Sequence, residues 1–500
     1  MNHILIGIDL GTTNTKTIVV DADGRTLALA AREYAVETPR PGWAEQNPAT
    51  WRQAAIETLK EAVATSGVSP AHVAAIGLSG QMHGAVLLDG HGQPVRPAII
   101  WPDQRAAAQV ERVYRQVGRE QLGRWTANPV AAGFMLVSWL WLVEHEPQTV
   151  RATRQMLLPK DYLRYCLTGA PGSEPSDASS TLLFDTAQRR WCAPLLAEFD
   201  IAEAILPPIH HSAEVAGGLT AELAAEVGLH AGTPVIYGGS DQAMQALGNG
   251  LIDPGLLSCT IGTGGQLFAP IREPTYDPEL RLHCFCHVLP NRWHLEAGVL
   301  TCGLALKWLR DNVVGLSYQE LADAAATVPP GAEGLLFAPY LAGERTPHMD
   351  PHARAAFVGL TLRHGRAHLA RAVMEGVVMA LRQGLELMLD LGASADRVIA
   401  SGGATRHPLW LQLQADIFNR PIYRTCSEEA AALGAAMLAG VGVGVYPDAA
   451  VACRRTVRWH EQAITPDAER AATYDALYRR FCQLYPRLKP LQESRGEDEG

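Results

Sequence analysis

The stretch ILIGIDLGTTNTKTIVV, residues 4–20, places two apolar runs on either side of a short polar turn. This pattern predicts a β-hairpin whose first strand ends at the carboxylate of Asp9. Gly11 allows a ligand to approach the backbone closely, and the hydroxyls of Thr12 and Thr13 can cradle phosphate oxygens together with successive amides. Asp9 could hold Mg²⁺ through water, because magnesium needs only one or two carboxylates besides waters and phosphates. An ordinary glycine-containing hairpin is the alternative.

A similar pattern returns in the second half of the chain, where LLSCTIGTGGQLF spans residues 256–268. Gly262 and Thr263 lie in the predicted turn between two strands. Two such hairpins, one in each half, predict two similar lobes that face each other across a cleft. The boundary between the lobes is expected near residues 252–255.

Between the hairpins, the run YGGSDQA at residues 237–243 carries Asp241. Residues 233–237 predict a buried strand, two glycines interrupt it, and residues 243–247 predict a helix. A carboxylate on such a turn is held rigidly enough to accept a proton from a substrate hydroxyl. An aspartate that only caps its helix would show the same pattern.

Three further loops carry polar residues next to apolar elements. In SGQMHG, residues 79–84, Gln81 and His83 lie between two glycines and could hydrogen-bond a polyhydroxylated ligand. A structural histidine is the alternative. Asp103 follows another predicted strand and could cap a helix or bind a sugar hydroxyl. SGGAT at residues 401–405 could let a nucleoside lie against its backbone, or could simply be a tight strand-to-helix connection.

Two helix starts are marked by local signals. Asn47–Pro48 predict the beginning of an amphipathic helix that ends near Thr65. Residues 465–467 predict another helix, ending near Tyr485, and the charged end from Gln492 is expected to fray.

Composition limits the classes of function. The chain has 500 residues, 47% of them hydrophobic, which is enough for more than one core, and a net charge of −10. No basic run could follow a phosphate backbone, so no nucleic-acid partner is expected. No apolar run reaches membrane-spanning length and no signal sequence is recognisable, so no membrane partner is expected. The nine cysteines form no repeated CxxC pair, and reduced thiols fit a cytoplasmic protein.

Several of these motifs occur together and in order, and on them the chain resembles the FGGY family of carbohydrate kinases, within the actin-like ATPase superfamily. The resemblance extends over about residues 4–445. The motifs that carry it are GIDLGTT at 7–13, SGQMHG at 79–84, LPKDY at 158–162, GSDQ at 239–242, GTGG at 262–265, PYLAGERTP at 339–347, SGGA at 401–404, and a second family signature from Ala355 to Glu375.

The resemblance implies an α/β fold of two actin-like or ribonuclease-H-like lobes, each a mixed sheet flanked by helices, around a central cleft. It implies an N-terminal lobe at residues 1–252, a C-terminal lobe at residues 253–447 and a helical tail at residues 448–500. The implied reaction transfers the γ-phosphoryl group of ATP, with Mg²⁺, to a ketopentose, from D-xylulose to D-xylulose 5-phosphate. The expected partners are therefore a small ketopentose and ATP, and a homodimer is an open expectation.

The residues and the resemblance together give the site residues their expected roles. Asp241 is the expected proton acceptor, and Asp9 is expected to support magnesium and catalysis. The expected sugar-binding residues are Gln81, Met82, His83, Asp103, Asp241 and Gln242. The expected nucleotide-binding residues are Gly11, Thr12, Thr13, Asn14, Lys16, Gly262, Thr263, Gly402, Gly403 and Ala404. Of these, Thr12, Thr13, Gly262 and Thr263 would hold phosphates, whereas Gly402, Gly403 and Ala404 would hold adenosine. Phosphoryl transfer depends mainly on positioning and charge neutralisation, which this division of roles supplies.

Three positions depart from the family pattern. Pro102 and Gln242 stand where Asn is common, and Ser138 stands where the first family signature expects Lys. Because Pro102 and Gln242 are in loops expected to face sugar, L-ribulose, a glycerol-like polyol and gluconate stay open as substrates.

Two other classes of function compete with the kinase interpretation. The start of the chain also resembles that of a 70-kDa heat-shock chaperone, but the short helical pattern after Tyr446 cannot supply a peptide-binding β domain. The chaperone interpretation also leaves the loop at residues 81–83 without a purpose. A sugar-binding regulator without catalysis would be favoured only if Asp9 or Asp241 were absent, and both are present.

Overall fold

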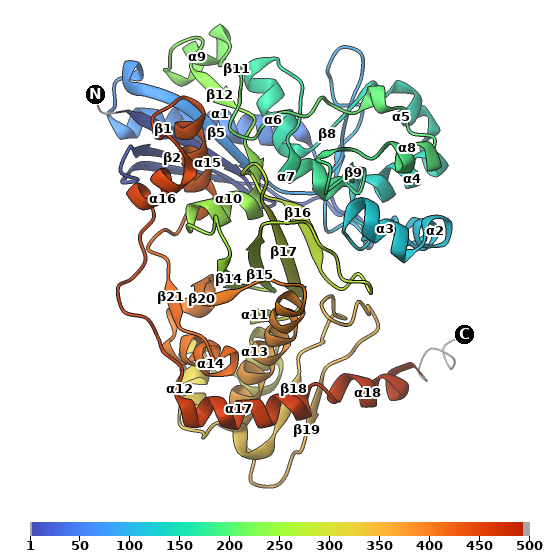
Figure 1. Cartoon of the computed structure of the whole chain (residues 1–500), viewed down its shortest axis with the longest axis vertical. Helices are drawn as coiled ribbons and strands as arrows, with labels where there is room; N and C mark the ends of the chain where they lie inside the picture. Colours follow the sequence, from blue (N-terminus) through green and yellow to red (C-terminus); the bar gives the residue numbers. More distant parts are fainter. Residues whose placement is uncertain (1–2, 494–500) are drawn as a thin grey trace.

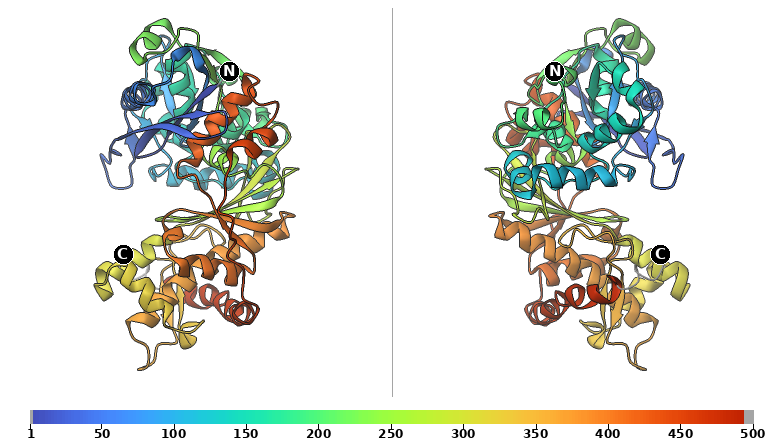
Figure 2. Two further views of the ribbon diagram at one scale, coloured as in Figure 1. Left: turned by 90° about the vertical axis from the view of Figure 1, so that its left-hand side faces the viewer. Right: turned by 90° about the vertical axis from the view of Figure 1, so that its right-hand side faces the viewer.

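The computed structural model describes residues 3–493. It consists of two lobes stacked along the longest axis of the molecule, with strands β14 to β17 between them (Figure 1, Figure 2). Each lobe is built on a mixed sheet flanked by helices, which confirms the predicted α/β class.

The first sheet contains the N-terminal hairpin. Its strands are β1 (Ile4–Leu10), β2 (Asn14–Asp21), β3 (Thr26–Glu33), β5 (Val73–Gly80), β11 (Val215–Gly218), β12 (Pro234–Ile236) and the short β13 (Gly239–Ser240). Their order is β11-β12-β5-β1-β2-β3, with β13 paired to β5. β1 and β2 are antiparallel, whereas β5 runs parallel to β1. The predicted first hairpin is therefore confirmed.

The second sheet contains the other hairpin. Its strands are β14 (Gly255–Ile261), β15 (Gly265–Ile271), β16 (His283–Cys286), β17 (Trp293–Val299), β20 (Ala395–Ser401) and β21 (Ile422–Arg424), in the order β16-β17-β15-β14-β20-β21. β14 and β15 pair antiparallel around the predicted Gly/Thr turn, as expected. β20 runs parallel to β14, so the turn that follows β20 lies beside the β14–β15 turn.

Helices and short strand pairs complete both lobes. The first-lobe helices are α1 (Pro48–Ser66), α2 (Ala107–Val117), α3 (Arg119–Thr126), α4 (Met135–His145), α5 (Pro147–Ala152), α6 (Pro159–Thr168), α7 (Pro175–Ala178), α8 (Ala193–Glu198), α9 (Ala221–Val227), α10 (Asp241–Gly248), α15 (Ala430–Gly442) and α16 (Ala449–Thr456). The second-lobe helices are α11 (Gly303–Leu309), α12 (Tyr318–Ala326), α13 (Arg366–Asp390), α14 (Pro408–Phe418), α17 (Ala468–Phe481) and α18 (Leu484–Glu493). The short pairs are β4 (Glu45–Gln46) with β7 (Ala98–Ile99), β6 (Val86–Leu88) with β8 (Gln155–Leu157), β9 (Phe184–Asp185) with β10 (Arg190–Trp191), and β18 (Leu336–Ala338) with β19 (Ala356–Val358).

Both predicted helix starts, one near each end of the chain, are confirmed. Asn47 accepts a hydrogen bond from the Ala49 amide as the N-cap of α1, and Asp467 caps α17 in the same way. The helix predicted to end near Tyr485 is divided in two, since α17 ends at Phe481 and α18 follows it. Most of the charged end predicted from Gln492 lies outside the described residues.

Helix α15 follows the second-lobe strand β21 in the sequence but packs on the first sheet, where Figure 1 shows it in orange-red beside β1 and β2. Glycines make this contact unusually close. A Cβ atom on Gly7 would lie 1.9 Å from the Ala432 carbonyl oxygen, and one on Gly77 would lie 1.9 Å from the Ala435 carbonyl oxygen. The chain thus returns to the first lobe after β21, and the boundaries at residues 252 and 447 stay predictions.

The segments that join the lobes are tied to one another by Trp459. Its indole nitrogen donates a hydrogen bond to the Asn249 carbonyl oxygen over 3.1 Å, and its backbone forms a bridge with Thr425. These residues belong to three stretches that pass between the lobes, so the connections lie together. Within residues 3–493, no helix is both long and apolar enough to cross a lipid bilayer.

Gly77→Ala should destabilise the protein, because the added methyl group would collide with the backbone of α15. Overpacking a core costs about 1–3 kcal/mol, so the melting temperature in circular dichroism should fall by several degrees. Gly365→Ala is the matched control, since a Cβ atom there meets nothing within 4 Å. Equal melting temperatures for Gly77→Ala and the wild type would contradict the close contact.

Candidate active site

Asp9 and Asp241 reach the same edge of the first sheet because β5 lies between their strands. Asp9 pairs with Ser79 across the parallel β1–β5 ladder, and Gly239 pairs with the same Ser79 across the β13–β5 ladder. Asp241 follows β13 directly and is the first residue of α10. The parallel pairing therefore brings together two carboxylates that lie far apart in the sequence.

Both carboxylates have raised pKa values. Burial raises the pKa of Asp9, and a hydrogen bond donated by the Ser79 hydroxyl over 2.6 Å opposes this effect. Burial raises the pKa of Asp241 well above its usual range, and the negative charges of Asp9 and Glu296 raise it further. A carboxylate with a raised pKa binds a proton more readily than an ordinary one, which suits a general base.

The N-cap position of α10 belongs to Ser240, whose side chain makes no capping hydrogen bond. Asp241 accepts one hydrogen bond from the amide of Gln242 over 2.8 Å, and both side chains are partly exposed. Capping of α10 therefore does not occupy the whole carboxylate of Asp241, which can still accept a hydrogen bond from a ligand.

A buried charged network supports the turn before Asp241. Lys160 donates a hydrogen bond to the Tyr237 carbonyl oxygen over 3.1 Å. The Ser240 amide donates to the Ser176 hydroxyl over 3.0 Å, and that hydroxyl donates to Glu174 over 2.8 Å. The fully buried charged residues of this network are Lys160, Asp161, Arg164, Glu174 and Asp177. The LPKDY motif marks Lys160 and Asp161, but no sequence signal marks Glu174 or Asp177.

The SGQMHG loop is strained at His83, whose φ of 69° lies in the left-handed region. The His83 ring stacks on Phe134 with 4.0 Å between ring centroids, and its Nδ1 lies 2.8 Å from the Ser180 carbonyl oxygen. Burial lowers the pKa of His83 to about 3, so the ring is neutral at pH 7. Met82 beside it is buried. Such strain is typical of positions held for function by their surroundings.

Two residues of the predicted sugar-binding set form hydrogen bonds with other side chains of the protein. The Gln81 amide donates to Gln46 over 3.1 Å, and Gln46 donates to the Thr12 carbonyl oxygen over 2.7 Å. Asp103 is fully buried, and both its oxygens accept hydrogen bonds from Arg105. Asp103 would have to give up these bonds to contact a ligand, whereas Gln81 Oε1 is buried without a hydrogen-bond partner in the described part of the chain. Both sugar-binding roles stay predictions.

The first Gly/Thr turn is closed by its own backbone. The Gly11 amide donates to the Asn14 carbonyl oxygen over 2.9 Å, and Thr13 is exposed. The Thr12 hydroxyl accepts a hydrogen bond from the Trp101 indole nitrogen over 2.8 Å. Trp101 is a contact that the sequence did not indicate, because only folding brings it next to the hairpin.

Lys16 lies next to Asp9 in the β1–β2 register, and its charge lowers the pKa of Asp9 against the effect of burial. Its Nζ lies 2.7 Å from a carboxylate oxygen of Glu429, the residue that precedes α15. Lys16 therefore links the hairpin to α15, and a phosphate would have to compete with Glu429 for it.

A cavity of about 450 Å³ lies in the second lobe beside the β14–β15 turn. It brings together Gly262, Thr263, Gly403 and Ala404, four of the residues predicted to bind nucleotide. Gly402 supports this wall from behind, since its φ is +82° and a Cβ atom there would lie 2.5 Å from the Ile261 carbonyl oxygen. The volume falls within the range of small-molecule sites.

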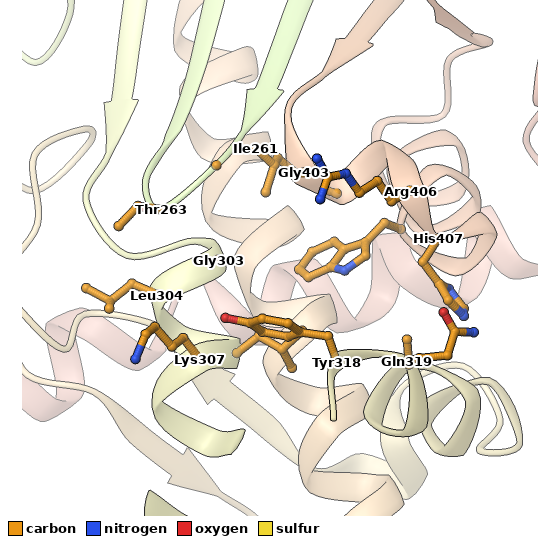
Figure 3. Close-up of a pocket in the computed structure, with 15 residues that line it drawn as sticks. Ile261, Thr263, Gly303, Leu304, Lys307, Tyr318, Gln319, Gly403, Arg406 and His407 are labelled. Carbon is orange, nitrogen blue, oxygen red and sulfur yellow. The ribbon is translucent and has the colours of Figure 1, made fainter. Parts of the chain in front are cut away.

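Figure 3 shows Lys307 and Tyr318 on one side of the cavity and Gly403 and Arg406 on the other. The lining residues that the sequence did not indicate are Ile261, Gly303, Leu304, Leu306, Lys307, Tyr318, Gln319, Ala322, Arg406, His407 and Trp410. Many of them come from α11, α12 and the start of α14, so only the packing of these helices reveals them.

The residues present fit the predicted magnesium ion. One oxygen of Asp9 accepts the Ser79 hydrogen bond, and no group of residues 3–493 hydrogen-bonds the other. Magnesium usually binds one or two carboxylates together with waters and substrate phosphates, so this single carboxylate beside the Gly/Thr turn is sufficient. No cluster of three or more His, Cys, Asp or Glu residues that could hold a metal occurs in the described part of the chain.

Comparisons with known proteins agree with this arrangement. Residues 4–248 match the N-terminal domain of the FGGY family of carbohydrate kinases, and residues 257–443 match its C-terminal domain. The chain is 37% identical to a xylulose kinase of Bacillus subtilis, over 97% of each chain. It superposes on a solved xylulose kinase from Rhodospirillum rubrum with a TM-score of 0.92 and 32% identity, covering 98% of this chain and 100% of that one. A solved gluconate kinase from Lactobacillus acidophilus gives a TM-score of 0.93 at 27% identity, with 98% of each chain covered. With both domains matched, the predicted resemblance is confirmed, and this chain belongs to the FGGY family of carbohydrate kinases.

Proposed function

We propose that this carbohydrate kinase uses ATP to convert D-xylulose to D-xylulose 5-phosphate, with Asp241 as general base. The observation that carries the proposal is the meeting of Asp241 with Asp9 beside the first Gly/Thr turn. The similarity to proteins named xylulose kinases supports the choice of sugar.

In the proposed reaction, Asp241 accepts the proton of the sugar hydroxyl as its oxygen bonds to the γ-phosphorus of ATP. The bond between that phosphorus and the β–γ bridging oxygen breaks, and ADP leaves. Asp9 would hold Mg²⁺, which when bound neutralises phosphate charge. The amides and hydroxyls of the two Gly/Thr turns would orient the phosphates, and the 450 Å³ cavity would hold the adenosine.

Other acceptor molecules compete with D-xylulose in this proposal. Gln242 and Pro102 replace residues common in the family, and the gluconate kinase superposes as well as the xylulose kinase does. A coupled assay of ADP release against D-xylulose, L-ribulose, glycerol and gluconate should show the highest kcat/KM for D-xylulose. A higher value for any other acceptor would replace the proposed substrate. A cytoplasmic location and a homodimer stay sequence-based proposals.

Asp241→Asn should lower kcat by about two to four orders of magnitude, the usual contribution of a positioned general base. Sugar and ATP binding, measured by calorimetry, should change little because the side chain keeps its shape. Asp390→Asn is the control, since Asp390 is an exposed carboxylate at the end of α13. Near-wild-type turnover in Asp241→Asn would refute its role as the base.

Asp9→Asn should raise the Mg²⁺ concentration required for half-maximal rate, because an amide is a weaker ligand for this cation than a carboxylate. The measurement is a Mg²⁺ titration of the rate at fixed ATP. An unchanged magnesium dependence would show that Asp9 does not support the metal.

Tyr318→Ala should raise KM for ATP by about 5- to 10-fold, because an aromatic wall of the cavity is lost. Tyr318 is 45% exposed at the start of α12, so folding should be little affected. Tyr318→Phe keeps the ring and should behave like the wild type. If KM for ATP stays constant in Tyr318→Ala while KM for sugar rises, the nucleotide lies elsewhere.

A further inference from the structure

Strand β17 carries buried polar atoms that lack hydrogen-bond partners within residues 3–493. His294 is fully buried, and neither of its ring nitrogens has a hydrogen-bond partner. The same holds for Oε2 of Glu296, which lies 3.8 Å from His294 Nε2. Alternate residues of a strand face the same side, so these side chains share one face of β17. Because buried unpaired polar atoms are costly, their concentration at one place requires an explanation.

A chain of ring contacts connects this face of β17 to the predicted sugar loop. The ring centroids of His83 and Phe285 are 5.9 Å apart, and those of Phe285 and His294 are 5.8 Å apart. Phe285 belongs to β16, the neighbour of β17, so second-lobe strands reach the SGQMHG loop of the first lobe. The polar face of β17 is thus adjacent to the proposed acceptor site.

Arg345 lies over the same face of β17. A Cβ atom on Gly298 would lie 3.8 Å from Arg345 Cδ, and Gly298 alternates with Glu296 along the strand. Burial lowers the pKa of His283 well below its usual range, and the charge of Arg345 lowers it further. Arg345 thus lies close enough to Glu296 and His283 to lower the pKa values of both. No hydrogen bond or ion pair in the described chain engages its guanidinium group.

Glu296 also lies within electrostatic reach of Asp241. Burial raises the pKa of Glu296 to about 7, and a side-chain hydrogen bond with Gln266 and then the charge of Arg345 oppose this effect. In turn, Glu296 contributes to the raised pKa of Asp241 after burial and Asp9. A carboxylate with an unpaired oxygen and an unengaged guanidinium therefore stand together on the second-lobe side of the proposed base.

We propose that Glu296 and Arg345 form the second-lobe half of the acceptor site and bind hydroxyl groups of the sugar. Glu296 Oε2 accepts a hydrogen bond from one hydroxyl, and Arg345 donates to another sugar oxygen. This inference rests on the proposed function, because it takes a polyhydroxylated acceptor as given. Hydrogen bonds to charged groups are stronger than neutral ones, so these contacts would also decide between epimeric sugars.

The competing explanation is that Glu296 acts only through its charge on Asp241. The two explanations differ in kinetics, since loss of a sugar contact raises KM and Kd for the sugar. Loss of an electrostatic effect on the base instead changes kcat and leaves sugar binding unchanged.

The experiment uses Glu296→Gln, which keeps the shape of the side chain, and Arg345→Lys, which keeps its charge. Kd for D-xylulose is measured by calorimetry without nucleotide, and KM for D-xylulose at saturating ATP. Both should rise about tenfold or more in Glu296→Gln, whereas KM for ATP should stay within about twofold. Preference for D-xylulose over L-ribulose, its C4 epimer, should decrease. Arg345→Lys should also weaken sugar binding, since an ammonium group cannot reproduce guanidinium geometry.

Glu273→Gln is the matched control, because Glu273 is exposed on the same lobe. Unchanged Kd and KM for D-xylulose in both Glu296→Gln and Arg345→Lys would overturn this inference while leaving the proposed function intact. A wild-type enzyme that neither binds nor phosphorylates D-xylulose would instead refute the proposed function, and this inference with it.

Discussion

The arrangement of the site depends on the position of β5, which pairs in parallel with β1 on one side and with β13 on the other. Parallel strands end at the same edge of a sheet, so the carboxylates that follow them must lie close together. Burial and mutual repulsion then raise the pKa of Asp241 well above its usual range. A loose loop could not keep two like charges so close to each other, and for this reason the turn before Asp241 is tied to Lys160 and Ser176.

Glycine packing gives the first sheet its rigid support. Gly7 and Gly77 allow the backbone of α15 to lie directly on β1 and β5, and Gly434 allows α15 to approach Met244 of α10 equally closely. Because α10 begins at Asp241, α15 supports both the sheet and the helix that carries the proposed base. The residue before α15, Glu429, also pairs with Lys16 of the first hairpin. One helix thus couples the first Gly/Thr turn to the turn at Asp241.

In the proposed function, the two lobes contribute different parts of the chemistry. The 450 Å³ cavity is lined by second-lobe residues, whereas Asp9, His83 and Asp241 belong to the first lobe. Second-lobe strand β16 brings Phe285 near the SGQMHG loop, and β17 brings Glu296 within electrostatic reach of Asp241. In the proposed function, a nucleotide held by one lobe therefore faces an acceptor surrounded by both.

The sequence by itself determined the two hairpins, the strand-to-helix turn at Asp241 and the start of α1 at Asn47–Pro48. These features depend on neighbours only a few residues away, so alternation, turn residues and caps are sufficient to predict them. Only the tertiary structure decided that α15 returns to the first sheet, that Tyr318 lines a cavity with Gly403, and that Asp103 is held by Arg105. Each of these depends on which distant segments meet. Long-range packing, unlike local backbone geometry, leaves no periodic pattern in the sequence of either partner.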